Sequence, residues 1–352
     1  MYDLKTEWFD WYVNDKPLGV KPLKHFLETD GAIYSVTVKT RDLPTDVGNI
    51  REESEAYLDK IIATCGFNKF AVLISGIDSE ILVRYLAKKK LDVEMYYIKF
   101  WMKDNFETDI LEQISKETGV KLNIIEWDWK KDKKSMLTLL SDYLTPTTVI
   151  STYLHAFEYI PADRYLLGGR RALCEGVAHA RNLARISKPH PRTRMHYVDL
   201  REVQGRYACH ISKRHSCLTF WFNDYRTAKS ILQDKRTIFF KEGGIYTKDI
   251  FLDDWPECTF RKSTHPFIGP NSLYKWEEWN LDHFKPKAAT AANMQRRYLR
   301  RKYGVQPSVV DFSRAFTNLW HFGASMNVDK LLGVESKEDP PSWDSVMTRP
   351  LS

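Results

Sequence analysis

The residues Lys69-Phe-Ala-Val-Leu-Ile-Ser-Gly-Ile-Asp-Ser-Glu80 carry the clearest structural pattern in this chain. The apolar run Phe70–Ile74 is typical of a buried strand, and it stops at the polar turn Ser75–Ser79. Apolar residues then recur with the spacing of one helix face, at Ile81, Leu82, Tyr85 and Leu86. The pattern therefore predicts a strand, a tight turn and a helix over 79–88. This geometry directs backbone N–H groups and a helix N-terminus towards an anion.

The polar turn contains side chains that suit a phosphate group. Ser75 and Ser79 offer hydroxyl donors, and Gly76 lets the backbone approach a ligand closely. Asp78 would repel a bare phosphate, so its carboxylate favours either a nucleotide bound with Mg²⁺ or a role in organising the turn. The same residues are also consistent with a simple strand-to-helix connection in which Asp78 or Ser79 caps the helix.

The alternation of strand and helix continues on both sides of this turn. It predicts helices over 51–64, 107–118, 135–144 and 147–158, and strands over 93–100, 121–126 and 164–169. Such alternation predicts an α/β fold with a doubly wound, mostly parallel sheet, helices on both faces and right-handed crossovers. Ligands of such sheets lie beyond the carboxyl ends of the strands, where both Ser75–Ser79 and Gly168-Gly169 are expected.

The organisation of the whole chain follows from where this alternation begins and ends. We expect an N-terminal extension with one strand over 32–39, then a nucleotide-binding domain, then an irregular and mainly helical region for a substrate or partner, and finally a tail. The expected bounds of these four parts are 1–50, 51–175, 176–330 and 331–352.

Composition narrows the class of protein. The chain has 352 residues, 43% of them hydrophobic and 28% charged, as in a globular protein of one large or two ordinary domains. No apolar run approaches the roughly 20 residues of a membrane helix, and residues 1–7 lack a signal-peptide profile. We therefore expect no membrane association and a cytoplasmic location. The five cysteines include no C-x-x-C pair, which favours reduced thiols. A zinc site would need an unusual ligand spacing, at Cys209, His210, His215 and Cys217.

The net charge of +7 suits an anionic partner such as ATP or a nucleic acid. Basic residues concentrate in the 190–215 segment, at Arg192, Arg194, Arg201, Arg206, Lys213 and Arg214. Interleaved aromatic residues make this segment a candidate surface for tRNA or DNA. The other interpretation is a solvated loop whose arginines pair with Asp199 and Glu202. Arg170 follows the glycine turn directly and is better placed to meet a phosphate, because guanidinium groups suit that geometry.

The turn Ser75–Ser79 resembles the phosphate loop of the PP-loop ATP pyrophosphatases, whose pattern is Ser-Gly-Gly-x-Asp-Ser. One glycine stands here where the family has two. The resemblance extends over about residues 52–175, where Gly119-Val-Lys-Leu122 and Leu166-Leu-Gly-Gly169 match later elements of the family. The helix before the loop strand is similar to that in the synthetase half of asparagine-synthetase-like enzymes.

The resemblance implies an enzyme that cleaves ATP between its α- and β-phosphates. Such an enzyme adenylates a substrate, releases pyrophosphate and completes an amidation or ligation. The resemblance also implies that Asp78 and Ser79 are catalytic and that Asp78 binds Mg²⁺. The residues that it assigns to ATP are Ser75, Gly76, Ile77, Ser79, Gly168, Gly169 and Arg170. No motif identifies the acceptor substrate.

The missing glycine bears on catalysis. Removing one residue displaces neighbouring N–H groups by up to ~3.8 Å, the spacing of consecutive Cα atoms. Ile77 would then need a backbone conformation that glycine usually supplies. Two alternatives to an adenylating enzyme therefore stay open. One is a catalytically inactive relative that acts as a structural or binding subunit, in an oligomer or a larger assembly. The other is a nucleic-acid-binding protein that uses the 190–215 segment.

Overall fold

The computed structural model describes the central part of the chain and short pieces on either side of it. The described residues are 8–19, 25, 29–30, 36–40, 46–99, 106–126, 154, 156–169, 195–197, 208–210, 212–236, 238–239, 245–246, 248–262 and 325–327. Several predicted features lie outside these ranges: the helix over 135–144, Arg170, most of the 190–215 segment and the tail over 331–352.

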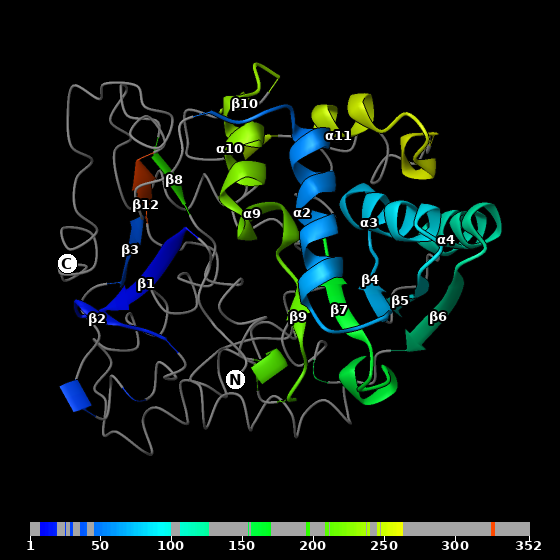
Figure 1. The fold of residues 1–352 in the computed structure, drawn as a ribbon, viewed down its shortest axis with the longest axis horizontal. Helices are drawn as coiled ribbons and strands as arrows, with labels where there is room; N and C mark the ends of the chain where they lie inside the picture. The colour runs from blue at the N-terminus through cyan, green and yellow to red at the C-terminus, as the bar shows by residue number, and fades with distance from the viewer. Residues whose placement is uncertain are drawn as a thin grey trace.

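A five-stranded sheet forms the centre of the fold (Figure 1). Its strands are β4 (Lys69–Leu73), β5 (Asp92–Lys99), β6 (Lys121–Glu126), β7 (Tyr165–Gly168) and β9 (Ser216–Cys217). Their spatial order is β6-β5-β4-β7-β9, and each neighbouring pair is parallel. This sheet confirms the α/β fold that the alternating sequence pattern predicts.

Three helices lead into or connect these strands. They are α2 (Ile50–Thr64) before β4, α3 (Ile77–Lys88) between β4 and β5, and α4 (Phe106–Thr118) between β5 and β6. The helices predicted over 51–64 and 107–118, and the strands predicted over 93–100 and 121–126, are confirmed to within one residue at each end. Gly119 ends α4 with a φ of 72°, a left-handed conformation that glycine adopts without strain.

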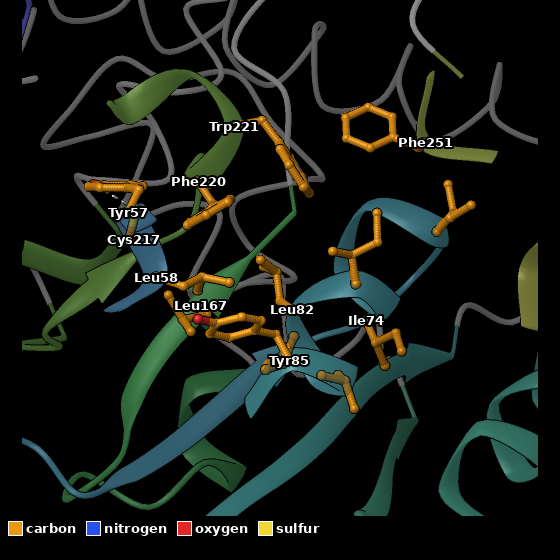
Figure 2. Close-up of a cluster of buried hydrophobic side chains, with 14 of the residues drawn as sticks. Tyr57, Leu58, Ile74, Leu82, Tyr85, Leu167, Cys217, Phe220, Trp221 and Phe251 are labelled. Carbon is orange, nitrogen blue, oxygen red and sulfur yellow. Dashed lines mark hydrogen bonds between the residues drawn. The ribbon is translucent and has the colours of Figure 1, made fainter. Parts of the chain in front are cut away.

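The central strand β4 places alternate side chains on the two faces of the sheet. Phe70 and Val72 belong to a buried cluster that includes side chains of α2, α3 and α4, part of which is drawn in Figure 2. Ala71 and Leu73 pack into a second cluster, which includes apolar side chains of the segment 156–160. Because both faces are covered, this strand is apolar throughout its middle, as in doubly wound sheets.

A second, antiparallel sheet lies towards the N-terminus. It contains β1 (Phe9–Val13), β2 (Lys16–Pro17) and β3 (Val36–Thr40) in the order β2-β1-β3. Asn14 and Asp15 connect β1 to β2 with φ values of 48° and 60°, as a two-residue type I′ hairpin requires. The pattern over 32–39 predicts part of β3 but neither β1 nor β2. Trp8 packs with Tyr225 at 6.2 Å between ring centroids, which joins this part of the chain to the main core.

Two helices lie within the described residues 217–236, for which we predict no separate elements from the sequence. These are α9 (Phe220–Asn223) and α10 (Tyr225–Gln233), and Arg226 of α10 binds Glu53 of α2 through two contacts of 2.7 Å. The Arg226–Glu53 pair thus fixes α10 against the helix that leads into β4.

The remaining elements are β8 (Met195–Tyr197), β10 (Ile238–Phe239), β11 (Ile245–Tyr246), α11 (Lys248–Asp254), the 3₁₀ helix η1 (Thr259–Lys262) and β12 (Ser325–Asn327).

Candidate functional site

The Ser75–Ser79 turn and the Gly168-Gly169 turn meet at one edge of the sheet. Ser75–Ser79 follows β4, and Gly168-Gly169 lies at the end of β7; the two strands are parallel neighbours with Leu73 opposite Gly168. The chain continues from β4 to β5 on one side, whereas β7 lies on the other side, so the strand order reverses between β4 and β7. Such a switch point, at the carboxyl ends of the strands, is where open α/β sheets bind ligands. The predicted proximity of the two turns is therefore present in the fold.

The first turn of α3 begins two residues earlier than the sequence pattern predicts. The carbonyl oxygen of Gly76 accepts hydrogen bonds from the backbone N–H groups of Ser79 (3.2 Å) and Glu80 (3.0 Å). Ile77 is consequently the first helical residue, and it is not among the described residues with positive φ. The expectation that Ile77 needs a glycine-like conformation is wrong, because starting the helix at Ile77 absorbs the shortened loop.

The side chain of Ser79 points into the turn rather than towards solvent. Ser79 is 4% exposed, and its hydroxyl accepts from the Ser75 N–H (3.1 Å) and donates to the Gly76 carbonyl (2.9 Å). Ser75, in contrast, is exposed at the end of β4. The Ser79 hydroxyl therefore holds the turn in shape, and the Ser75 hydroxyl is the one that a ligand can reach.

The space over Gly76 is open. A Cβ atom built on Gly76 would meet nothing within 4 Å, although its φ of 176° is extended backbone that any residue adopts. Within the described part of the chain, the N–H groups of Gly76 and Ile77 donate to no other residue. Both N–H groups lie at the positive end of the α3 dipole, so this surface suits an anionic group.

Gly168 and Gly169 are required by close backbone contacts. A Cβ atom on Gly169 would lie 2.5 Å from the Asp78 carbonyl carbon and 2.5 Å from the Ser79 nitrogen. A Cβ atom on Gly168 would lie 2.7 Å from the carbonyl oxygen of Leu218. Gly169 thus lets the chain at the end of β7 pack directly on the first turn of α3, which closes one side of the candidate site, and Gly168 lets β7 approach the backbone of Leu218.

Trp221 approaches the peptide group between Asp78 and Ser79 from α9. Its indole N–H donates to the carbonyl oxygen of Asp78 at 3.3 Å. The ring belongs to an aromatic cluster, which we define as Phe220, Trp221, Phe251 and Trp255. Sequence reasoning does not place Trp221 at the site, because 143 residues separate it from Asp78 and no local pattern connects them.

Comparisons with known proteins give only distant likenesses. No family model matches this chain, and no curated protein matches it either. The chain is similar to the NMN synthetase from Francisella tularensis, with 13% identity and a TM-score of 0.28 over 35% of this chain and 54% of that one. It thus spans about half the length of that protein. It is also similar to the NH3-dependent NAD synthetase from Campylobacter jejuni subsp. jejuni in complex with the nitrate ion. That similarity has 11% identity and a TM-score of 0.29 over 83% of this chain and 97% of that one. Because the identities and TM-scores are this low, neither structure assigns a function to this chain.

A charged network fixes the outer side of the first turn of α3. Glu80 is fully buried and accepts from the N–H groups of Thr259 (2.5 Å) and Phe260 (2.9 Å) and from Nε of Arg84 (2.7 Å). Arg84 also donates to the carboxylate of Glu117 on α4 (2.5 Å). Burial raises the pKa of Glu80, although its three donors favour the charged form. Glu80 therefore connects α3 to η1 and does not face the open edge.

Glu117 makes a testable contribution to acid stability. Its hydrogen bond with Arg84 lowers the pKa of Glu117 to about 2. The folded-state pKa is thus below the unfolded value, so the stabilisation is present at neutral pH and is lost as the pH falls towards 2. Because 31% of its side chain is exposed, Glu117→Gln should cost only about 1 kcal/mol at pH ~7. Urea unfolding near pH ~7 and pH ~3 should show that the variant loses less stability on acidification than the wild type does.

The sequence suggests two candidate metal sites, a zinc site among cysteines and histidines and a Mg²⁺ site at Asp78. Among the described residues, no group of three or more His, Cys, Asp or Glu side chains is arranged to hold a metal ion. This includes Cys209, His210, His215 and Cys217, so the unusual zinc site does not form. Asp78 is half-buried in the first turn of α3, and one carboxylate is what a Mg²⁺ ion carried by phosphate oxygens and water needs from a protein.

The other sequence predictions are only partly covered by the structure. Arg170 and four of the six basic positions of the 190–215 segment (Arg192, Arg194, Arg201 and Arg206) lie outside the described ranges, whereas Lys213 and Arg214 lie within them. Arg214 donates to the carbonyl oxygens of Phe157 and Ile160, which ties it to the second buried cluster. Among the described residues, no helix is both long and apolar enough to cross a membrane.

Proposed function

We propose that this chain binds ATP with Mg²⁺, its phosphates lying over the turn from Ser75 to Asp78. The observation that carries the proposal is the position of this turn. It lies at the switch point between β4 and β7, with open space over Gly76 and two backbone N–H groups that donate to no other residue in the described part of the chain. Because a switch point and a helix N-terminus coincide there, a phosphate group is the ligand that the edge suits best.

Each residue of the turn receives a different role in this proposal. The N–H groups of Gly76 and Ile77 and the hydroxyl of Ser75 bind phosphate oxygens. The Asp78 carboxylate binds the Mg²⁺, which would reduce the negative charge on the phosphates when it is bound. Ser79 keeps the turn in shape through its two internal hydrogen bonds.

The glycines of β7 complete the proposed site. Gly169 lets the chain at the end of β7 close one side of the turn, and Arg170 follows it directly in the sequence. A guanidinium group in that position would suit a second phosphate.

Beyond binding, we propose a reaction in which the bound ATP adenylates a substrate with release of pyrophosphate, followed by amidation or ligation. It rests on the resemblance of Ser75–Ser79 to the PP-loop pattern and of the preceding helix to asparagine-synthetase-like enzymes. The alternative is a catalytically inactive relative that binds the nucleotide without turnover. The internal hydrogen bonds of Ser79 favour that alternative, because a hydroxyl that braces the loop is not available to the pyrophosphate.

Calorimetric titration with ATP and Mg²⁺ tests the proposal. We expect the wild type to bind, and Asp78→Ala to weaken Mg²⁺-dependent binding at least ~10-fold, or about 1.4 kcal/mol. Asp59→Ala is the matched control, because Asp59 is an exposed carboxylate on α2 that pairs with Lys89 instead. It should bind ATP as the wild type does.

The outcomes separate the alternatives. An absence of binding at millimolar ATP would contradict the proposed function. Binding with exchange of labelled pyrophosphate into ATP would support the adenylating enzyme. Binding without any exchange, across a panel of carboxylate and amine acceptors, would support the inactive relative.

A further inference from the structure

The peptide group between Asp78 and Ser79 is held from two sides by elements distant in sequence. On one side, Gly169 lies so close that a Cβ atom there would be 2.5 Å from both the Asp78 carbonyl carbon and the Ser79 nitrogen. On the other side, the indole N–H of Trp221 donates to the Asp78 carbonyl oxygen at 3.3 Å. Since a peptide group is planar, fixing its oxygen also fixes the orientation of the Ser79 N–H.

The orientation of the Ser79 N–H affects the rest of the turn through further hydrogen bonds. The Ser79 N–H donates to the Gly76 carbonyl at 3.2 Å, and the Ser79 hydroxyl donates to the same oxygen at 2.9 Å. The Ser79 hydroxyl in turn accepts from the Ser75 N–H at 3.1 Å. A continuous series of hydrogen bonds therefore runs from Trp221 to Ser75. Because the Gly76 carbonyl and the Ile77 N–H belong to one planar peptide group, the series also sets the orientation of the Ile77 N–H.

Trp221 is itself firmly held. It is fully buried, and its ring packs against Phe251 at 4.5 Å, Phe220 at 5.0 Å and Trp255 at 5.7 Å between centroids. Figure 2 shows Trp221 and Phe251 side by side near the first turn of α3. Because tight packing leaves the indole little freedom to rotate, its N–H is a fixed donor rather than an adaptable one.

We infer that Trp221 is a positioning residue for the phosphate-binding turn. It acts through the Asp78 carbonyl and touches no ligand. The inference rests on the proposed function, because it concerns the site to which ATP is assigned. It adds that the shape of the turn depends on Trp221 of α9 as well as on the turn's own sequence.

The test compares two tryptophans of the same cluster. Trp221→Phe keeps an aromatic ring and removes the N–H donor. Trp255→Phe makes the same chemical change at a ring that has no hydrogen bond to the turn among the described residues. We expect Trp221→Phe to weaken binding of ATP with Mg²⁺ by about 3- to 10-fold, the effect of one lost hydrogen bond. Trp255→Phe should leave binding within about 2-fold, whereas both variants should lower the urea midpoint to a similar extent.

A second measurement does not depend on ATP. Without the indole donor, amide hydrogen exchange at residues 75–80 should become several-fold faster in Trp221→Phe but not in Trp255→Phe. If Trp221→Phe does not fold, Phe251→Leu serves instead, because it loosens the packing of Trp221 and should change binding and exchange in the same direction.

The results distinguish this inference from the proposed function. Wild-type binding that Trp221→Phe leaves unchanged, or that Trp255→Phe weakens equally, would overturn the positioning role. If the wild type does not bind ATP, the proposed function fails, and the exchange measurement alone decides the inference. Equal exchange at residues 75–80 in both variants would then overturn it.

Discussion

Replacing Gly169 by alanine is expected to lower the free energy of unfolding by about 3 kcal/mol or to prevent folding. The added methyl group would lie 2.5 Å from two backbone atoms, the Asp78 carbonyl carbon and the Ser79 nitrogen. Neither atom belongs to a flexible side chain, so relief requires β7 and the first turn of α3 to separate. That separation would also strain the hydrogen bond from Trp221 to Asp78. Urea denaturation followed by far-UV circular dichroism measures the loss.

Gly76→Ala is the matched control for this prediction. Its methyl group would meet nothing within 4 Å, and the φ of 176° is open to alanine. We expect its stability to stay within about 0.5 kcal/mol of the wild type. Under the proposed function, however, the methyl group would occupy space assigned to phosphate and weaken ATP binding. Gly169 is needed for packing and Gly76 for access, so the two variants should separate stability from binding. Equal losses of stability in both variants would contradict the geometry of the turn.

The turn and its flanking elements could be predicted from the sequence because their pattern is local. The apolar run of β4 and the helical spacing after Ser79 are each determined by a few consecutive residues. The alternation that follows predicts a parallel sheet, and a parallel sheet brings the ends of its strands to one edge. This is why Gly168-Gly169 could be expected beside Ser75–Ser79 before the fold was known.

The shape of the turn could not be predicted in the same way. The start of α3 at Ile77 follows from hydrogen bonds to the Gly76 carbonyl, which compete with a start at Ser79 by small energies. Trp221 and Glu80 act through partners 143 and 179 residues away in sequence. Helical spacing alone would make Glu80 a solvated residue, since a charged side chain is rarely fully buried without partners. Apart from Arg84 on the same helix, its partners are the backbone N–H groups of Thr259 and Phe260, which no sequence pattern marks.

Glu80→Ala is expected to destabilise the fold by about 3 kcal/mol. The substitution leaves the N–H groups of Thr259 and Phe260 buried without their acceptor and removes one carboxylate from Arg84. Glu55→Ala is the matched control, because Glu55 also pairs with an arginine of its own helix, Arg51, but is partly exposed. That variant should lose no more than about 0.5 kcal/mol. Urea unfolding at neutral pH compares the two.

The pH dependence of Glu80→Gln then separates charge from hydrogen bonding. Burial raises the pKa of Glu80 in the folded state above its unfolded value of about 4.3. Between these two values the folded state binds more protons than the unfolded one, so this group lowers the free energy of unfolding as the pH rises. Glutamine does not titrate, so the unfolding free energy of the variant should not fall in this way as the pH rises. Its amide N–H₂ group would face the N–H donors that surround Glu80, and this keeps the variant less stable than the wild type at low pH. A variant whose unfolding free energy ran parallel to the wild type from pH ~4 to pH ~7 would show that the pKa of Glu80 is the same in the folded and unfolded states, and that its donors offset its burial.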